Sequence, residues 1–212
     1  LVEGKPNFLA VTGFAMASYK TRRMAVALGK GHHTNPGIKE NKVFSASLPS
    51  EDMVEKTDYC GIVSGKNTDR SMVLEVFYGG LRTAPMIKHC LLSMECELVE
   101  IVESGATEIL IGKIKGTYTE ERFLSDGKWE FIKRKPLILS LSRMRSIGAW
   151  GNRWPAHGTS ARNTKPAGRG RISAGFHALL PWRIVRIAAP PRRAARKSAI
   201  HSESTGMLAI SA

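Results

Sequence analysis

The sequence predicts a mainly β (α+β) protein, in which the strands form a small barrel with short inserted helices. Three observations favour this fold class. Several apolar runs have the length of a β-strand, and some of them alternate with small polar residues. Glycine, proline, asparagine and serine separate these runs and are typical of turns. The sequence has no internal repeat and no βαβ rhythm, so a doubly wound parallel sheet is not expected.

The first two strands are expected at Phe8–Val11 and Met24–Leu28, with a polar segment between them. The loop that follows the second strand, residues 29–36, combines glycines, a lysine, two histidines and a threonine. A short helix is expected directly after this loop and should end near Asn41.

The loop at residues 29–36 is a candidate anion-binding site. Thr34 or Asn35 can cap the helix, and Pro36 suits its first turn. Glycine lets the backbone approach a ligand closely, and a helix N-terminus beside Lys30 favours a negative charge. A phosphate-bearing cofactor is therefore one interpretation. The other is an ordinary connection between a strand and a helix, because no fixed phosphate-binding motif is present.

The later elements are predicted by the same criteria. Val43–Leu48 alternates apolar and small polar residues, which predicts a strand with one buried face. Ser50 should cap a helix that ends near Gly65, and the acids along this helix are explained by a solvated face. A polar loop should follow at residues 64–71. Further strands are expected at residues 91–102, 109–118 and 136–141, with turns at residues 104–105 and 125–128.

The net charge of +14 is unevenly distributed along the chain. Residues 1–140 contain 19 Lys and Arg against 17 Asp and Glu, whereas residues 141–212 contain 13 against 1. This contrast predicts two parts: a nearly neutral domain at 1–140 and a basic, low-complexity tail at 141–212, which we expect to be unstructured.

No residue can be assigned a catalytic or metal-binding role from its spacing. His32 and His33 are adjacent, so their side chains diverge in an extended segment and do not favour a shared metal. The spacing of Cys60, Cys90 and Cys96 matches no redox or zinc motif, so packing in the core is the preferred interpretation.

The sequence also indicates the cellular compartment of the protein. No apolar run approaches the ~18 residues that a membrane span requires, so no membrane partner is expected. An odd number of cysteines fits a reducing cytoplasm better than a disulfide framework. The chain starts at Leu1, and we expect its natural N-terminus to lie upstream.

Four stretches resemble the flavin reductase-like, FMN-binding split-barrel proteins, the flavoredoxin type in particular: residues 4–11, 24–69, 75–90 and 95–103. The similarity covers about residues 1–140 almost without gaps. It implies a split β-barrel of antiparallel strands and a homodimer that holds FMN near the dimer interface. In such a protein the flavin is reduced by NAD(P)H or passes electrons to a redox protein partner.

The resemblance also implies which residues contact the cofactor. One segment of the family lines the isoalloxazine ring, a loop holds the FMN phosphate, and a loop–helix corner lies near the cofactor. The matching positions are Thr12, Gly13 and Phe14 for the ring, Lys30, His33, Thr34 and Asn35 for the phosphate, and Tyr59, Cys60, Gly61 and Ser64 for the corner.

The sequence departs from the family pattern in three places. Gly13 stands where family members usually have an aromatic residue, and Arg22-Arg23 stands where they often have paired prolines. The first strand of the family is largely absent before Leu1, which predicts an exposed sheet edge and a cost in stability. These departures are expected to weaken the binding of the cofactor.

The closing Tyr-Trp and Gly-Glu segment of the family is missing, but a change of reading frame restores it. Back-translation of Ser142–Trp154, read one frame later, gives Pro-Asp-Ala-Lys-Tyr-Trp-Arg-Leu-Gly-Glu-Pro-Val. We therefore interpret the tail as a frameshifted translation without an evolved function.

The function expected from these residues is that of an FMN-binding redox protein, either a flavin reductase or a flavoredoxin-like electron carrier. The truncated start and the altered C-terminus could impair it. One alternative is an FMN-binding module without turnover. The other is a nucleic-acid-binding protein, for which the basic tail would provide only non-specific contacts.

Overall fold

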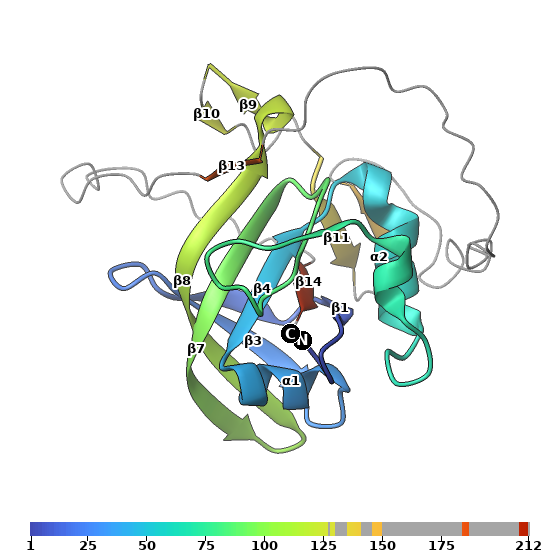
Figure 1. Cartoon of the computed structure of the whole chain (residues 1–212), viewed down its shortest axis with the longest axis vertical. Coiled ribbons are helices and arrows are strands. Elements are labelled where there is room, and N and C mark those ends of the chain that lie inside the picture. The colour runs from blue at the N-terminus through green and yellow to red at the C-terminus, as the bar shows by residue number, and fades with distance from the viewer. Residues whose placement is uncertain (127, 130–134, 141–145, 150–183, 187–207, 212) are drawn as a thin grey trace.

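A computed structural model of the protein describes residues 1–126, 128–129, 135–140, 146–149, 184–186 and 208–211. Antiparallel strands dominate it, with two short α-helices, which confirms the predicted fold class (Figure 1). Within the described ranges, no helix has the length and apolar character that crossing a membrane requires.

The main sheet has eight strands, and its order along the principal path is β1-β14-β4-β7-β8-β3-β2, with β13 pairing to β8. Every pairing in it is antiparallel. Its strands are β1 (Phe8–Val11), β2 (Phe14–Ser18), β3 (Arg23–Gly29), β4 (Val43–Leu48), β7 (Leu92–Ser104), β8 (Thr107–Glu120), β13 (Ile184–Arg186) and β14 (Leu208–Ser211).

Three two-stranded pairs and a few helices complete the described structure. The pairs are β5 (Val76–Phe77) with β6 (Met86–Ile87), β9 (Leu124–Ser125) with β10 (Lys128–Trp129), and β11 (Leu137–Ser140) with β12 (Ser146–Ala149). The α-helices are α1 (Thr34–Asn41) and α2 (Val54–Ile62), and the 3-10 helices are η1 (Glu51–Met53), η2 (Arg70–Val73) and η3 (Glu121–Phe123).

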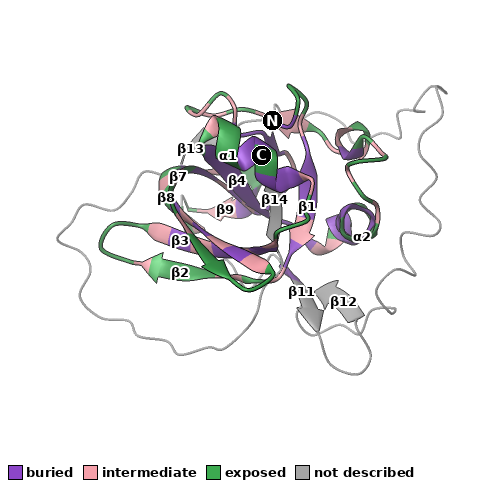
Figure 2. Ribbon diagram, turned by 90° about the horizontal axis from the view of Figure 1, so that it is seen from below, coloured by how far each residue is buried: buried purple, intermediate pink, exposed green. Residues whose placement is uncertain are grey.

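The hairpin of β7 and β8 forms the centre of the sheet. Its tight turn includes Gly105, which has a φ of 56° and therefore lies in the left-handed region that glycine tolerates. Gly112 on β8 leaves room for the ring of Phe44, which is fully buried beneath it. The sheet curls around this core, and α2 packs along β1 at its margin (Figures 1 and 2).

Strand β4 departs from the expectation of a single buried face, because all six of its residues are buried. Phe44 and Ala46 belong to the main apolar core. On the other face, the hydroxyl of Ser45 donates to the carbonyl of Pro85 at 2.6 Å, and Ser47 shares a hydrogen bond of 2.9 Å with Ser93. The polar face is therefore covered by protein, and its hydroxyl groups are satisfied there.

The helix boundaries also differ from the prediction. His33 is the N-cap of α1 and makes no side-chain cap, so Thr34 and Asn35 lie within the first turn. The helix expected from Ser50 to about Gly65 is instead a 3-10 turn, η1, followed by α2, which ends at Ile62.

Asp58, which was expected on a solvated face, is completely buried in α2. Strand β2 was not predicted as a strand.

Three segments of the region 141–212 are strands, which departs from the expectation of a tail without regular structure. β12 pairs with β11, β13 pairs with β8, and β14 lies between β1 and β4. β1, the first strand of the chain, is thus paired with β14. The remaining residues of the tail lie outside the described part of the chain.

Candidate functional site

A cavity of about 230 Å³ lies where β1, the loop before α1 and the end of α2 meet. It is lined by Leu9 and Ala10 of β1, by residues 31–34, by residues 60–64 and by Arg70. The lining therefore combines an apolar strand, the N-terminal end of one helix and the C-terminal end of another. Such a combination of apolar walls with a few polar groups is typical of ligand sites.

The N-terminal end of α1 gives the cavity a wall with anion-binding character. Residues 31–34 line it, and the helix begins at Thr34. The amide of Asn7 donates to the hydroxyl oxygen of Thr34 at 2.7 Å, which leaves the hydroxyl proton of Thr34 available for another acceptor. The partial positive charge of a helix N-terminus favours a negatively charged group at this position.

Arg70 adds a buried positive charge to the lining of the cavity. Its side chain is 6% exposed, and its Nη1 donates to the carbonyl of Cys60 at 2.8 Å. Its Nε is buried and has no hydrogen-bond partner. Burial lowers the pKa of Arg70, and the neighbouring Cys60 and Tyr59 oppose this shift only in part. An arginine remains charged under such conditions, so the site holds a guanidinium whose donors are not all used.

The carboxylate next to this arginine in the sequence does not pair with it. Asp69 accepts hydrogen bonds from the amide of Ser71 at 2.9 Å and from its hydroxyl at 2.6 Å, and so caps η2. Among the described residues, no ion pair with a carboxylate is observed for Arg70. Its charge is thus uncompensated within the described part of the molecule.

The structure brings several of the predicted cofactor-binding residues together at this cavity. His33 and Thr34 line it from the α1 side, and Cys60, Gly61 and Ser64 line it from the α2 side. These two groups are far apart in the sequence, so their convergence is a finding of the structure.

The other predicted residues do not line the cavity. Lys30 forms an exposed ion pair of 2.8 Å with Glu103. Asn35 donates to the carbonyl of Gly29 at 3.0 Å and to Glu108 at 3.1 Å. The remaining ones are Tyr59, which is buried within α2, and Thr12, Gly13 and Phe14, which form the connection from β1 to β2 and its first residue.

Arg70 is the charged residue of this cavity that the sequence did not single out. It lies in the stretch expected to be a polar loop, and no motif surrounds it. The sequence feature that could have indicated Arg70 is a cation a few residues after the end of a helix, where it can reach the last carbonyl groups of that helix.

The three cysteines are free and buried, as predicted from their spacing. Burial raises the pKa of Cys60 to about 11, and it also raises the pKa of Cys90 and Cys96. All three are therefore protonated at neutral pH. Thiolate chemistry is not favoured at these positions, although Cys60 lines the cavity.

A second cavity, of about 240 Å³, lies at the other end of α2. It is lined by Ser50, residues 52–53, Lys56, residues 74–75, residues 88–89 and Arg122. Its charged groups are largely paired with one another, as are those around a much smaller adjoining cavity of about 10 Å³.

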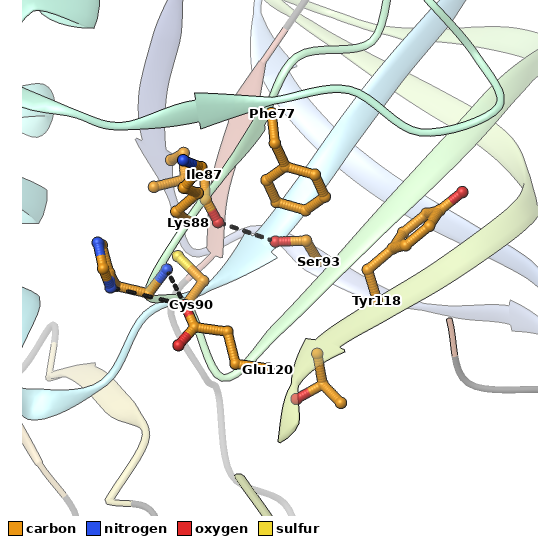
Figure 3. A pocket seen from close by; sticks show the side chains of 9 residues that line it. Phe77, Ile87, Lys88, Cys90, Ser93, Tyr118 and Glu120 are labelled. Carbon is orange, nitrogen blue, oxygen red and sulfur yellow. Dashed lines mark hydrogen bonds and ion pairs between the residues drawn. The ribbon is translucent and has the colours of Figure 1, made fainter. Parts of the chain in front are cut away.

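Figure 3 shows the smaller cavity, with Phe77, Ile87 and Tyr118 around it and Glu120 at one side. Its size suits a single water molecule at most. The first cavity, which has an uncompensated charge, is therefore the stronger candidate site.

The antiparallel sheet curls into a barrel-like fold, and the partly apolar, cationic cavity is a candidate site for an anionic small molecule. A family model described as "Flavin reductase like domain" matches residues 2–148. The chain therefore belongs to the flavin reductase-like family, and its fold is the split barrel of that family.

Solved structures agree with this assignment. The chain is 39% identical to flavoredoxin from Methanosarcina acetivorans, with a TM-score of 0.68 over 76% of this chain and 87% of that one. It is 29% identical to flavoredoxin of Desulfovibrio vulgaris (Miyazaki F), with a TM-score of 0.64 over 76% and 86% of the two chains.

Among curated proteins, an uncharacterised protein of Aeropyrum pernix is 28% identical over 149 residues. This match covers 69% of the present chain but only 56% of the relative, so the chain spans little more than half of that relative's length.

Proposed function

We propose that the protein is an FMN-binding redox protein, with its cofactor at the cavity between β1, α1 and α2. The observation that carries this proposal is the cavity of about 230 Å³, with an uncompensated Arg70 on one wall and the N-terminus of α1 on another. Membership of the flavin reductase-like family supports a flavin as the ligand.

The residues present fit the phosphate end of FMN. The cavity is smaller than the ~300–1,000 Å³ of typical small-molecule pockets, so it suits one end of an elongated cofactor. The guanidinium of Arg70, which lines the cavity, and the hydroxyl proton of Thr34 are groups of the kind that a phosphate requires. Leu9 and Ala10 provide an apolar wall beside them.

When bound, FMN would supply the redox chemistry, because a flavin accepts and donates electrons. The residues of the chain would bind and orient the cofactor. NAD(P)H is the proposed electron donor, with a redox protein partner as the second possibility. The proposal includes a homodimer, and no side chain is assigned a catalytic step.

The test is to purify the protein and titrate it with FMN, following the quenching of flavin fluorescence. We expect saturable binding of one FMN per chain and a yellow protein that releases FMN on denaturation. NAD(P)H oxidation in the presence of oxygen then separates an enzyme from a binding module without turnover. A protein that remains colourless and binds no flavin at micromolar concentration would contradict the proposal.

A further inference from the structure

The hairpin of β2 and β3 carries a group of cations on the side of the molecule away from α2. Lys20 and Arg22 lie in its turn, and both are exposed. Arg23 begins β3 and stands opposite the exposed Lys113 of β8. Directly opposed residues of an antiparallel pair lie on the same face, so Lys113 extends the positive surface onto β8. Among the described residues, none of these four cations forms an ion pair.

The nearest acid in the register does not neutralise this group. Glu97 of β7 stands opposite Lys113, but its carboxylate lies 3.3 Å from the Nζ of Lys115. Both members of that pair are exposed, so the pair contributes little to the surrounding potential. The surface around the turn therefore remains positive.

The same hairpin exposes apolar side chains beside its charges. Tyr19, in the turn, is 84% exposed, and Met16 of β2 is 45% exposed. Ala15 and Ala17, on either side of Met16, are exposed as well. β2 is at the end of the strand order, and the exposed tip of the hairpin projects from the barrel (Figure 2). Aromatic residues and arginine are enriched in protein–protein interfaces, so this surface has the composition of a docking site.

We propose that this surface, the hairpin patch (Tyr19, Lys20, Arg22, Arg23 and Lys113), is the docking site for an acidic electron-carrier protein. The inference rests on the proposed redox function and adds to it where a second redox protein binds and which charge that protein carries. Positive and negative potentials face each other across protein interfaces, so four unpaired cations select a partner with a carboxylate-rich face.

β2 links the hairpin patch to the segment expected to contact the flavin. The strand has five residues, about 17 Å, and begins at Phe14, which the family resemblance places along the isoalloxazine ring. A standard protein interface covers ~800 Å² on each partner, which is about 30 Å across. A protein docked on the hairpin patch would therefore also cover the start of β2. This position suits a protein that exchanges electrons with the flavin.

Other occupants fit the hairpin patch less well. A two-fold contact between copies of the chain would place the patch against itself, and like charges in an interface are unfavourable. Single-stranded nucleic acid stacks on several aromatic side chains, whereas Tyr19 is the one aromatic residue of the patch. Arg22-Arg23 also stands where members of the family often have paired prolines, so the charge is a feature of this chain and does not follow from the fold.

Protection of the sheet edge is the competing explanation for these charges. Edge strands expose unpaired backbone groups, and natural proteins place lysine and other charges there to prevent aggregation. A protective charge works with either sign, whereas docking of an acidic partner requires a positive sign. Reversal of the charges therefore separates the two explanations, because it retains protection and removes docking.

The experiment compares the unaltered chain with the double variant Lys20→Glu/Arg22→Glu and with Tyr19→Ser. The matched control is Lys66→Glu/Lys128→Glu, which reverses two exposed cations elsewhere and makes the same change in net charge. The tail is unaltered in every protein. The probes are two acidic electron carriers, a ferredoxin and a flavodoxin, and one basic carrier, cytochrome c. Dissociation constants are measured by titration calorimetry at low and high salt, with and without added FMN.

We expect micromolar binding of the acidic carriers at low salt and no binding of cytochrome c. The double reversal should weaken binding at least tenfold, and Tyr19→Ser by about three- to tenfold. The control should weaken it by less than about twofold, because salt screens charges that lie far from an interface. Solubility of the double reversal should match that of the unaltered chain, since the edge remains charged.

Equal weakening in the double reversal and in the control would reduce the attraction to net charge and overturn the docking site. The absence of binding by both acidic carriers at ~100 µM would also overturn it. Patch-dependent binding of a DNA oligonucleotide tighter than that of either carrier would assign the patch to nucleic acid. Loss of a dimer in the double reversal would assign it to a second copy, and both results refute the proposal. Docking does not require flavin in this assay. A chain that binds the carriers through the patch but binds no FMN would therefore support the docking site and refute the proposed cofactor.

Discussion

The two ends of helix α2 face cavities of similar size, about 230 and 240 Å³. The two cavities differ in whether their charged side chains are paired with groups of opposite charge. At the C-terminal end, Arg70 is buried and has no carboxylate partner among the described residues. At the N-terminal end, acids and bases neutralise one another. Glu75 lies 3.6 Å from Lys88 and 3.4 Å from His89, and Glu120 lies 2.6 Å from Arg122.

This difference separates a binding site from a structural cluster. A network in which charges satisfy one another stabilises the fold and offers little to a ligand. A buried charge without a partner costs stability, and it is retained at sites where a ligand supplies the missing partner. Cavity volume alone would not have distinguished the two ends of α2.

The largest effect on stability is expected from Glu120→Ala at the N-terminal end. Glu120 accepts from the backbone amide of His89 at 2.6 Å and from Nε of Arg122 at 2.6 Å. His89 has a φ of 67°, a conformation that is strained for a side chain of its size. Loss of these charge-assisted bonds should cost about 2–3 kcal/mol in urea unfolding.

The control for this prediction is Glu121→Ala, which removes an exposed acid one position further along. It should change the free energy of unfolding by less than about 0.5 kcal/mol. FMN affinity should be unchanged in both variants. A specific loss of FMN affinity in Glu120→Ala would show that the charged cluster takes part in cofactor binding, and the contrast between the two ends would be lost.

The second prediction concerns Cys60, where burial controls the titration. Burial is the chief cause that raises the pKa of Cys60 to about 11 from its usual value of 9.0. The folded state therefore holds the proton more tightly than the unfolded state, and stability is lost as pH rises from about 9 to about 11. With allowance for partial solvent access, we expect a loss of about 1–2 kcal/mol over this window.

Chemical unfolding at several alkaline pH values measures this effect. In Cys60→Ser the same pH change should cost less, since serine does not ionise in this range. Cys96, the pKa of which is also raised, contributes equally to both proteins and cancels in the comparison. The pKa of Cys90 is raised chiefly by burial and only in smaller part by Cys60, so most of its contribution cancels as well. Identical pH slopes would mean that Cys60 is accessible to solvent.

Much of the fold could be predicted from local sequence patterns, because the periodicity of apolar residues reflects burial. The strands β1, β3, β4, β7 and β8 and both α-helices were expected at nearly their observed positions. Strand β2 was missed because its three central residues are exposed, so no apolar alternation marks it. Strand β14 pairs with β1 across almost the whole chain, and no local pattern encodes so distant a pairing.

The site was predictable only in part, for the same reason. The resemblance to the family placed His33, Thr34 and Cys60 near a cofactor, and they do line one cavity. It did not indicate Arg70, because the importance of that residue comes from its burial and from its lack of a partner. Both are properties of the folded chain and leave no mark on the neighbouring sequence.

The third prediction tests the position of the guanidinium without removing its charge. A Cβ atom added at Gly65 would approach Oδ1 of Asn7 most closely and would also lie 2.5 Å from Nη2 of Arg70. The ends of both side chains must therefore move, and Asn7 is the donor to Thr34. Gly65→Ala should therefore weaken FMN binding by about fivefold, equivalent to about 1 kcal/mol. Riboflavin binding serves as the internal control and should not change. Equal weakening for both ligands would indicate a general distortion of the cavity.

The smallest effect is expected from Glu75 at the N-terminal end. Burial alone would raise its pKa, but the hydrogen bond and charge of His89, together with Lys88, lower the pKa of Glu75 below its usual value of 4.5. An acid with a lowered pKa contributes stability above the pKa of the unfolded state. This contribution is lost as pH falls from about 4.5 through the lower folded value.

Glu75 is 61% exposed, so water screens its charge and the contribution should be only a few tenths of a kcal/mol. Glu75→Gln should therefore lower stability slightly near neutral pH and match the unaltered chain in acid, where both side chains are neutral. Urea midpoints measured at about pH 7 and about pH 3 test this. If Glu75→Gln is more stable than the unaltered chain at neutral pH, the negative charge of Glu75 destabilises the folded state. The paired cluster would then not be neutralised as the distances indicate, and the contrast with the uncompensated Arg70 at the other end of α2 would have to be abandoned.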